Sequence, residues 1–171
     1  MFKTLLAVLI CSTALFAQHD EMHHHAPGPT HTQKQAPQSP GAIAAVKQRM
    51  IGNLAAWSSM DINKAAEFYD KDPGDIFFDV EPLQYHGWSE YQQGGQKLFD
   101  TFKSLKLTLN DDAKIHMGGY TSAWASATVN FDATDKGGKT NHMVLRWTSV
   151  WEKENGQWLC VHEHMSAPLR Q

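Results

Sequence analysis

Cysteine is nearly absent from this chain: only Cys11 and Cys160 occur among its 171 residues. A disulfide-rich secreted scaffold is therefore excluded, and the fold must depend on its hydrophobic core. Neither sign of charge dominates, since 15 Lys and Arg residues stand against 18 Asp and Glu residues. Without a strongly basic surface there is no electrostatic reason to expect a nucleic-acid-binding protein. Runs of like charge are also missing, which argues against a charged tail or a membrane-binding patch.

Long apolar runs are scarce as well, and the one over residues 5–17 is too short for a comfortable transmembrane span. Lys3 precedes it and small residues end it, the pattern of a secretory signal peptide. We expect cleavage after Ala17, export to the periplasm or the medium, and no membrane association afterwards. An uncleaved membrane anchor is the alternative. Cleavage would leave Cys160 alone, in an apolar strand pattern typical of a small buried side chain.

Residues 18–41 are rich in His, Pro, Gln and Thr and nearly free of large apolar side chains. Such a segment cannot bury enough surface to offset its ordering entropy, so we predict a disordered linker. Its five histidines could hold transition metals loosely, and the alternative is a soluble spacer, because a flexible tract lacks fixed ligand geometry.

The remaining residues, 42–171, carry the pattern of one folded domain. Apolar side chains recur at helical spacing over 42–58, and Asp61 is typical of the N-cap of a second helix that runs to Tyr69. A third helix is expected over 89–105. Strands are expected over 76–80, 105–109, 115–117, 120–132, 142–153 and 157–166, with hairpin turns at 135–138 and 154–156. Helices followed by a meander of long strands indicate an α+β fold.

Three segments carry a resemblance to a known superfamily. They are Phe77-Phe78-Asp79 through Trp88, Arg146-Trp147-Thr148 to Trp151, and Gly156-Gln157-Trp158 through Ser166. Together with the element order, they resemble the SnoaL-like branch of the nuclear-transport-factor-2-like superfamily over residues 43–168. Ketosteroid isomerase and the association domain of calcium/calmodulin-dependent kinase are members of this superfamily. The resemblance implies a cone in which three N-terminal helices pack on a strongly curved antiparallel sheet, a pocket inside the cone, and a homodimer.

Strand alternation groups the polar residues near the C-terminus. On strand 142–153 the side chains of His142 and Arg146 share a face, and on strand 157–166 those of His162 and His164 do. We expect these residues in one patch that looks into the pocket, where a guanidinium and imidazoles would receive an anion or carbonyl oxygen. The opposite row would then lie outside as a self-association surface: Met143, Leu145, Trp147 and Trp151. The alternative is a purely structural patch.

Asp79 and His162 are the candidate catalytic groups. In ketosteroid isomerase, a general-base Asp lies at a position similar to that of Asp79, and a carboxyl against an apolar wall has a raised pKa. The isomerase also has an oxyanion-binding Tyr after a Gln-Arg pair, whereas here Gln48-Arg49 is followed by Met50. Asp79 could instead cap a turn. His162 could move a proton near neutral pH.

Three aromatic residues, Tyr69, Tyr85 and Trp88, are expected at the pocket wall.

Two functions stay open. The first is binding of a small, anionic or carbonyl-containing hydrophobic ligand, with weak lyase, isomerase or hydrolase activity. The second is a non-enzymatic association module. No cofactor is expected. A metal site built from His142, His162 and His164, or metal capture by the linker histidines, is a weaker alternative.

Overall fold

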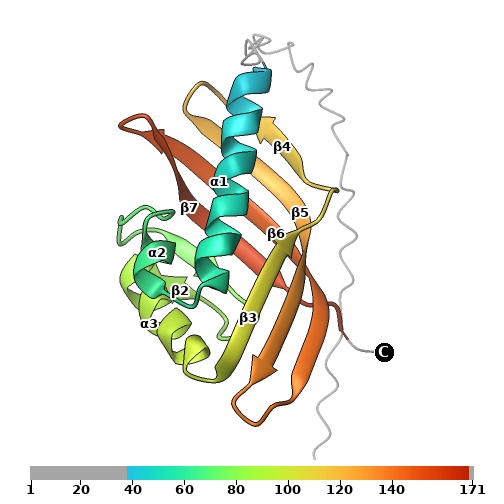
Figure 1. Ribbon diagram of the computed structural model, residues 1–171. Helices are drawn as coiled ribbons and strands as arrows, with labels where there is room; N and C mark the ends of the chain where they lie inside the picture. The colour runs from blue at the N-terminus through green and yellow to red at the C-terminus, as the bar shows by residue number, and fades with distance from the viewer. Residues whose placement is uncertain (1–37, 170–171) are drawn as a thin grey trace, which may run out of the picture. The chain divides into compact units, whose positions relative to one another are not determined.

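The computed structural model describes residues 38–169, so the predicted signal peptide and nearly all of the predicted linker lie outside the described residues. Over this range three helices pack on a curved sheet of seven strands (Figure 1). The elements are α1 (Pro40–Ser58), α2 (Ile62–Ala66), β1 (Ile76–Phe78), β2 (Tyr85–His86), α3 (Gly87–Phe99), β3 (Phe102–Leu109), β4 (Lys114–Met117), β5 (Ser122–Asp135), β6 (Thr140–Glu154) and β7 (Gln157–Ser166). The predicted α+β class and its cone-like layout are confirmed.

The sheet has the order β2-β1-β7-β6-β5-β3, and β4 also pairs with β5. Long antiparallel hairpins join β5 to β6 and β6 to β7. The second hairpin turns at Asn155 and Gly156, whose φ angles are 48° and 86°, as a tight turn that matches the twist of its strands requires. The expectation of a purely antiparallel sheet is wrong at one place, because β1 pairs with β7 in parallel.

Helix α1 lies across the concave side of the sheet (Figure 1). Pro40 fits its first turn because that backbone position needs no N–H donor. Asp61 caps α2 as predicted, since its Oδ1 accepts the backbone N–H of Asn63 at 3.0 Å. The third helix ends at Phe99 rather than at residue 105, and the chain enters β3 at Phe102. None of the helices within residues 38–169 is long and apolar enough to cross a membrane.

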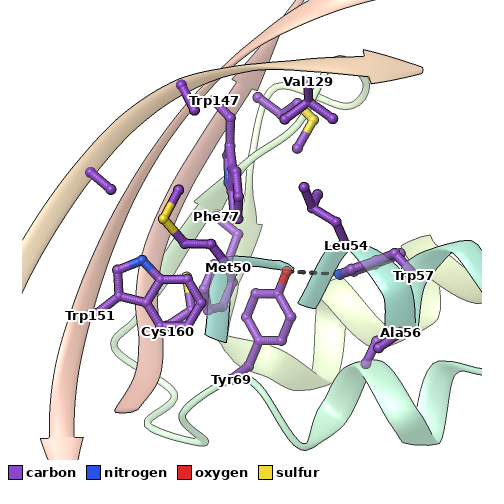
Figure 2. Packing of buried hydrophobic residues seen from close by; sticks show 14 of the residues in the cluster. Met50, Leu54, Ala56, Trp57, Tyr69, Phe77, Val129, Trp147, Trp151 and Cys160 are labelled. Carbon is purple, nitrogen blue, oxygen red and sulfur yellow. Dashed lines mark hydrogen bonds between the residues drawn. The ribbon is translucent and has the colours of Figure 1, made fainter. Parts of the chain in front are cut away.

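The core lies between α1 and the concave face of the sheet. Trp147, Trp151 and Phe77 project from the sheet toward Met50 of α1, with Tyr69 below them (Figure 2). Each of these side chains is almost fully removed from water, which stabilises the fold by about 2 kcal/mol per large apolar side chain. Cys160 is buried among them as a free thiol, in agreement with its predicted role as a small core side chain.

Candidate functional site

A cavity of about 1070 Å³ opens inside the cone, between α1, α3 and the concave face of the sheet. Its size is at the upper limit of small-molecule pockets, which span roughly 300 to 1000 Å³. Most of its wall is apolar or aromatic, and the following residues form that part: Leu54, Trp57, Tyr69, Val80, Pro82, Tyr85, Tyr91, Leu98, Phe102, Leu105, Leu107, Phe131, Met143, Leu145 and Met165. The cone is therefore hollow rather than filled by its core.

The direction of β6 decides which side chains face this cavity. Met143 and Leu145 line it, and Trp147 is buried on the same side of the strand. Arg146 and Val144, which alternate with them, point to the opposite side and are exposed. The predicted orientation of β6 is thus wrong. Burying large apolar side chains is favourable, whereas burying a guanidinium without an anion is costly.

A β-bulge in β7 then exchanges the faces of its second half. Val150 pairs with His162 and Trp151 pairs with Cys160, so Val161 is an extra residue with no partner on β6. One inserted residue turns every following side chain to the other side of the sheet. As a result Glu163 faces inward together with Cys160, and the histidines on either side of Glu163 face outward.

Glu163 is the centre of a buried polar cluster at the inner end of the cavity. Its side chain is 1 % exposed and receives three hydrogen bonds from neutral donors. The hydroxyls of Tyr69 and Tyr91 donate to Oε1 at 2.8 and 2.5 Å, and the indole of Trp147 donates to Oε2 at 2.8 Å. The Tyr69 hydroxyl in turn accepts the indole N–H of Trp57 at 2.8 Å, the dashed contact of Figure 2. These bonds fix the carboxyl rigidly.

The electrostatics of the cluster favour a proton on the carboxyl. Burial raises the pKa of Glu163 from 4.5 to about 7, and the nearby charge of Asp79 adds to the increase. Hydrogen bonds from Tyr91, Tyr69 and Trp147 lower the pKa and partly offset this effect. Within residues 38–169 the carboxyl has no cationic partner. A carboxyl with a pKa near 7 can give or take a proton at physiological pH.

Asp79 directly follows β1 and lines the cavity, on the same side of the chain as buried Phe77. Its Oδ1 accepts the backbone N–H of Val80 at 2.7 Å, so the carboxyl also closes a local turn. Burial raises the pKa of Asp79. Burial raises the pKa values of Tyr85 and Tyr91, which line the same cavity, and the charge of Asp79 adds to both increases.

Asn53 of α1 completes the inner end of the cavity. It is 1 % exposed, and its Oδ1 lies 3.4 Å from the Tyr69 hydroxyl. Its Nδ2 has no hydrogen-bond acceptor within the described part of the chain. An unpaired buried donor costs about 1 to 3 kcal/mol, which a water or an oxygen of a ligand would recover.

The structure separates the predicted site residues into two groups. Asp79, Tyr69 and Tyr85 line the cavity. Trp88 lies one layer behind, where it stacks on Tyr69 with ring centroids 4.7 Å apart and receives the ammonium of Lys71 on its face.

The predicted polar patch exists, but on the outer face of the sheet and away from the cavity. His164 lies opposite Thr148 on β6, diagonal to Arg146. His162 uses Nδ1 to hydrogen-bond the backbone oxygen of Ile76 at 2.7 Å. His142 pairs with Asp132 at 2.5 Å farther along the outer face. Across residues 38–169 no three His, Cys, Asp or Glu side chains gather closely enough to hold a metal ion.

Glu163, Tyr91 and Asn53 are the candidate site residues that the sequence analysis missed. Tyr91 lies on the buried face of α3, where its ring stacks on that of Phe77 with centroids 5.0 Å apart. Its place in the sequence pattern is that of any buried core residue. Glu163 stands between two histidines, and only a bulge upstream brings it inside. The available signal in the sequence was the charged residue Glu163 itself, because it stands in a strand between the apolar residues Cys160 and Met165.

The ionisable groups along the cavity wall are mainly acidic. Asp79, Glu81, Glu90 and Glu163 contribute carboxyls, and Lys97 is the only Lys or Arg among the lining residues of the described chain. The cavity therefore presents a negative potential to an entering molecule.

Comparison with known proteins agrees with this geometry. A family model described as a SnoaL-like domain matches residues 46–170. A nuclear-transport-factor-2-like superfamily protein from Salmonella enterica serovar Typhimurium is similar in structure, with a TM-score of 0.70, 23 % identity, and coverage of 78 % of this chain and 96 % of that one. A ketosteroid isomerase-like protein from Erwinia carotovora matches with a TM-score of 0.66, 15 % identity, and coverage of 77 % and 100 %.

A protein from Xanthomonas campestris described as a calcium/calmodulin dependent protein kinase II association domain is also similar. Its TM-score is 0.65 at 22 % identity, and the match covers 80 % of this chain and 94 % of that one. None of the curated proteins matches the chain. At these identities the solved structures establish a shared fold, which hosts several unrelated activities.

Proposed function

The chain belongs to the SnoaL-like domain family, and from that membership we propose that its cavity binds a small, largely apolar molecule. The observation that carries this proposal is the hollow cone itself. About 1070 Å³ of space is walled by apolar and aromatic side chains and ends at the buried cluster around Glu163. A cavity with a mainly apolar and aromatic wall and a smaller number of polar side chains favours a ligand with a hydrophobic body and few hydrogen-bonding groups.

The charge of the wall narrows the class of ligand. The anionic ligand expected from the sequence loses its support, because Arg146 lies outside and carboxyls line the cavity. A carbonyl or hydroxyl oxygen fits the inner end, where Asn53 has a free N–H donor beside the Glu163 cluster. The ligand is therefore neutral or cationic.

Proton transfer on the bound molecule is a second candidate function. Asp79 and Glu163 line the same cavity, and both have raised pKa values. A carboxyl of that kind can act as a general base or acid near neutral pH. The similar protein from Erwinia carotovora is described as ketosteroid isomerase-like, in agreement with such chemistry in this fold. Exchange of ligand C–H for deuterium, lost in Asp79→Asn, would support this candidate.

Self-association is compatible with ligand binding, because the sheet has two faces. On the face away from the cavity, Trp124 and Val144 are 45 % and 50 % exposed. Apolar exposure of this kind favours a homodimer through the outer sheet. Static light scattering at micromolar concentration tests this part, and a monomer would contradict it.

We propose that the protein is exported, because an apolar run over residues 5–17 follows the single Lys3, as in a secretory signal peptide. Expression of the full chain in a bacterium, followed by intact-mass measurement of the periplasmic fraction, should give a product that lacks residues 1–17. An uncleaved product that stays in the membrane fraction would contradict export.

Two neighbouring residues on β6 allow a matched test of ligand binding. Leu145 lines the cavity, whereas Val144 lies on the outer face. Leu145→Trp should fill part of the cavity and weaken binding of the neutral dye N-phenyl-1-naphthylamine at least about tenfold, a loss of about 1.4 kcal/mol. Val144→Trp adds a similar volume outside and should bind like the unaltered protein. No saturable dye binding by the unaltered protein, or equal binding by both variants, would contradict the proposal.

A further inference from the structure

Asp79 and Glu163 line an aromatic cavity and make no ion pair within residues 38–169, which points to the chemistry of a ligand. We propose that the ligand carries a protonated amine on its apolar body and that Asp79 receives the ammonium group. This inference rests on the proposed ligand-binding function and assigns the substrate class of the same cavity.

Of the two cavity carboxyls with raised pKa values, Asp79 has more hydrogen-bonding capacity left for a ligand than Glu163. Glu163 is already surrounded by three donors and is 1 % exposed, so little of its hydrogen-bonding capacity is left. Within residues 38–169 Asp79 accepts one hydrogen bond, from the backbone N–H of its neighbour Val80 to Oδ1. No ion pair joins Asp79 to a Lys, Arg or His anywhere in residues 38–169. A carboxylate takes up to about four hydrogen bonds, so donors are lacking at Asp79.

Aromatic rings line the same cavity. Tyr85 and Tyr91 lie on its wall together with Asp79, and their ring centroids are 5.1 Å apart at a tilt of 34°. Aromatic faces attract organic cations, by about 0.5 to 1 kcal/mol at exposed sites and about 2 kcal/mol when water is excluded. A carboxylate flanked by phenol rings therefore recognises an alkylammonium group through charge and through the ring faces at once.

The other charged side chains of the cavity wall also favour a positively charged ligand. Glu81 and Glu90 lie on the wall of the same cavity as Asp79, and Lys97 of α3 is the one lining Lys or Arg in the described residues. Burial raises the pKa values of Asp79 and Glu163, the charge of Asp79 adds to the increase at Glu163, and neither carboxyl has an ion-pair partner within residues 38–169. A cation would relieve both effects, whereas an anionic ligand would add to them.

The alternative is a neutral ligand that binds while the carboxyls are protonated. The pH dependence of binding distinguishes this alternative from an amine ligand. Binding of an amine should weaken as the pH is lowered, because protonation of Asp79, whose pKa is raised by burial, removes the charge that pairs with the ammonium. Binding of a neutral molecule should change little over the same change of pH.

The experiment compares three probes of nearly equal shape by titration calorimetry with the full chain in low salt. They are 1-naphthylmethylamine as the cation, 1-naphthylmethanol as the neutral isostere and 1-naphthoate as the anion. At pH 7.5 the amine should bind at least about tenfold more tightly than the alcohol, and the naphthoate most weakly. Asp79→Asn should remove the preference for the amine while binding of the alcohol stays unchanged.

Asp132→Asn is the matched control, because Asp132 lies on the outer face and pairs with His142. It should keep the amine preference. Equal binding of amine and alcohol by the unaltered protein would overturn the amine assignment and leave the proposed ligand binding intact. An amine preference that survives in Asp79→Asn would overturn the role of Asp79. Failure of all three probes, together with failure of the neutral dye, would overturn the proposed function itself.

Discussion

Replacing Glu163 by Gln should change how the stability of the protein depends on pH. A glutamine can accept the indole N–H of Trp147 with its oxygen and donate its amide to the hydroxyl oxygens of Tyr69 and Tyr91. It therefore copies the protonated acid in shape and in hydrogen bonding. The variant should fold, and at pH 4.5 its unfolding free energy should lie within about 1 kcal/mol of the unaltered protein.

The raised pKa of Glu163 determines in which direction the stability changes with pH. In the folded state Glu163 titrates at about 7, above its ordinary value of 4.5, so the native protein holds this proton more tightly than the unfolded chain. The stabilising effect of that proton is fully present below pH 4.5 and is lost as pH rises to about 7. The difference of pKa corresponds to roughly 3 kcal/mol, at about 1.4 kcal/mol per unit. Glu163→Gln removes this loss, so the variant should gain roughly 3 kcal/mol relative to the unaltered protein by pH 8.

Urea unfolding at pH 4.5, 6, 7 and 8.5 measures this difference directly. Glu152→Gln, an exposed position on β6, is the control and should show no trend of this kind. A stability difference between Glu163→Gln and the unaltered protein that stays constant from pH 4.5 to 8.5 would refute the buried, proton-holding carboxyl.

Three further substitutions test separate parts of the structure. Tyr69→Phe leaves the indole N–H of Trp57 without its acceptor and should cost about 1 to 3 kcal/mol of unfolding free energy, measured in urea. Gly94→Ala places a Cβ 2.3 Å from the Tyr85 hydroxyl at the cavity wall, so the ring must move. Dye binding should fall at least about tenfold, while better helix propensity keeps the stability change near 1 kcal/mol; unchanged dye binding would refute this. Arg146→Ala on the outer face should alter neither dye binding nor stability by more than about 0.5 kcal/mol, and a larger loss of binding would place the guanidinium in the site.

Local patterns in the sequence are sufficient for most of the elements. The apolar spacing of α1, the N-cap at Asp61 and the turn at Asn155-Gly156 each depend on a few neighbouring residues, and each is found as predicted. The end of α3 was predicted too late. Phe102, which lies within the helix predicted over 89–105, belongs to β3, where it pairs with Asp135 of β5. Pairing with a distant strand decided that boundary, and no local pattern carries it.

The candidate site was predicted less well, for two physical reasons. Alternation along β6 gives two rows but does not say which row is inside, and burial of Leu145 and Trp147 outweighs any benefit of burying Arg146. The bulge at Val161 then reverses the second half of β7 and brings Glu163 inside. A single unpaired residue leaves almost no mark in a strand pattern, so alternation alone placed His162 and His164 in the cavity.

The most direct test of the central claim is an NMR measurement of where a bound ligand lies. With N-phenyl-1-naphthylamine at saturation, intermolecular nuclear Overhauser effects are recorded to the methyl groups of two adjacent residues, Leu145 inside the cone and Val144 outside it. Contacts from the aromatic protons of the dye to Leu145 and not to Val144 are the predicted result. Contacts to Val144 without any to Leu145 would place the ligand on the outer sheet and contradict the account.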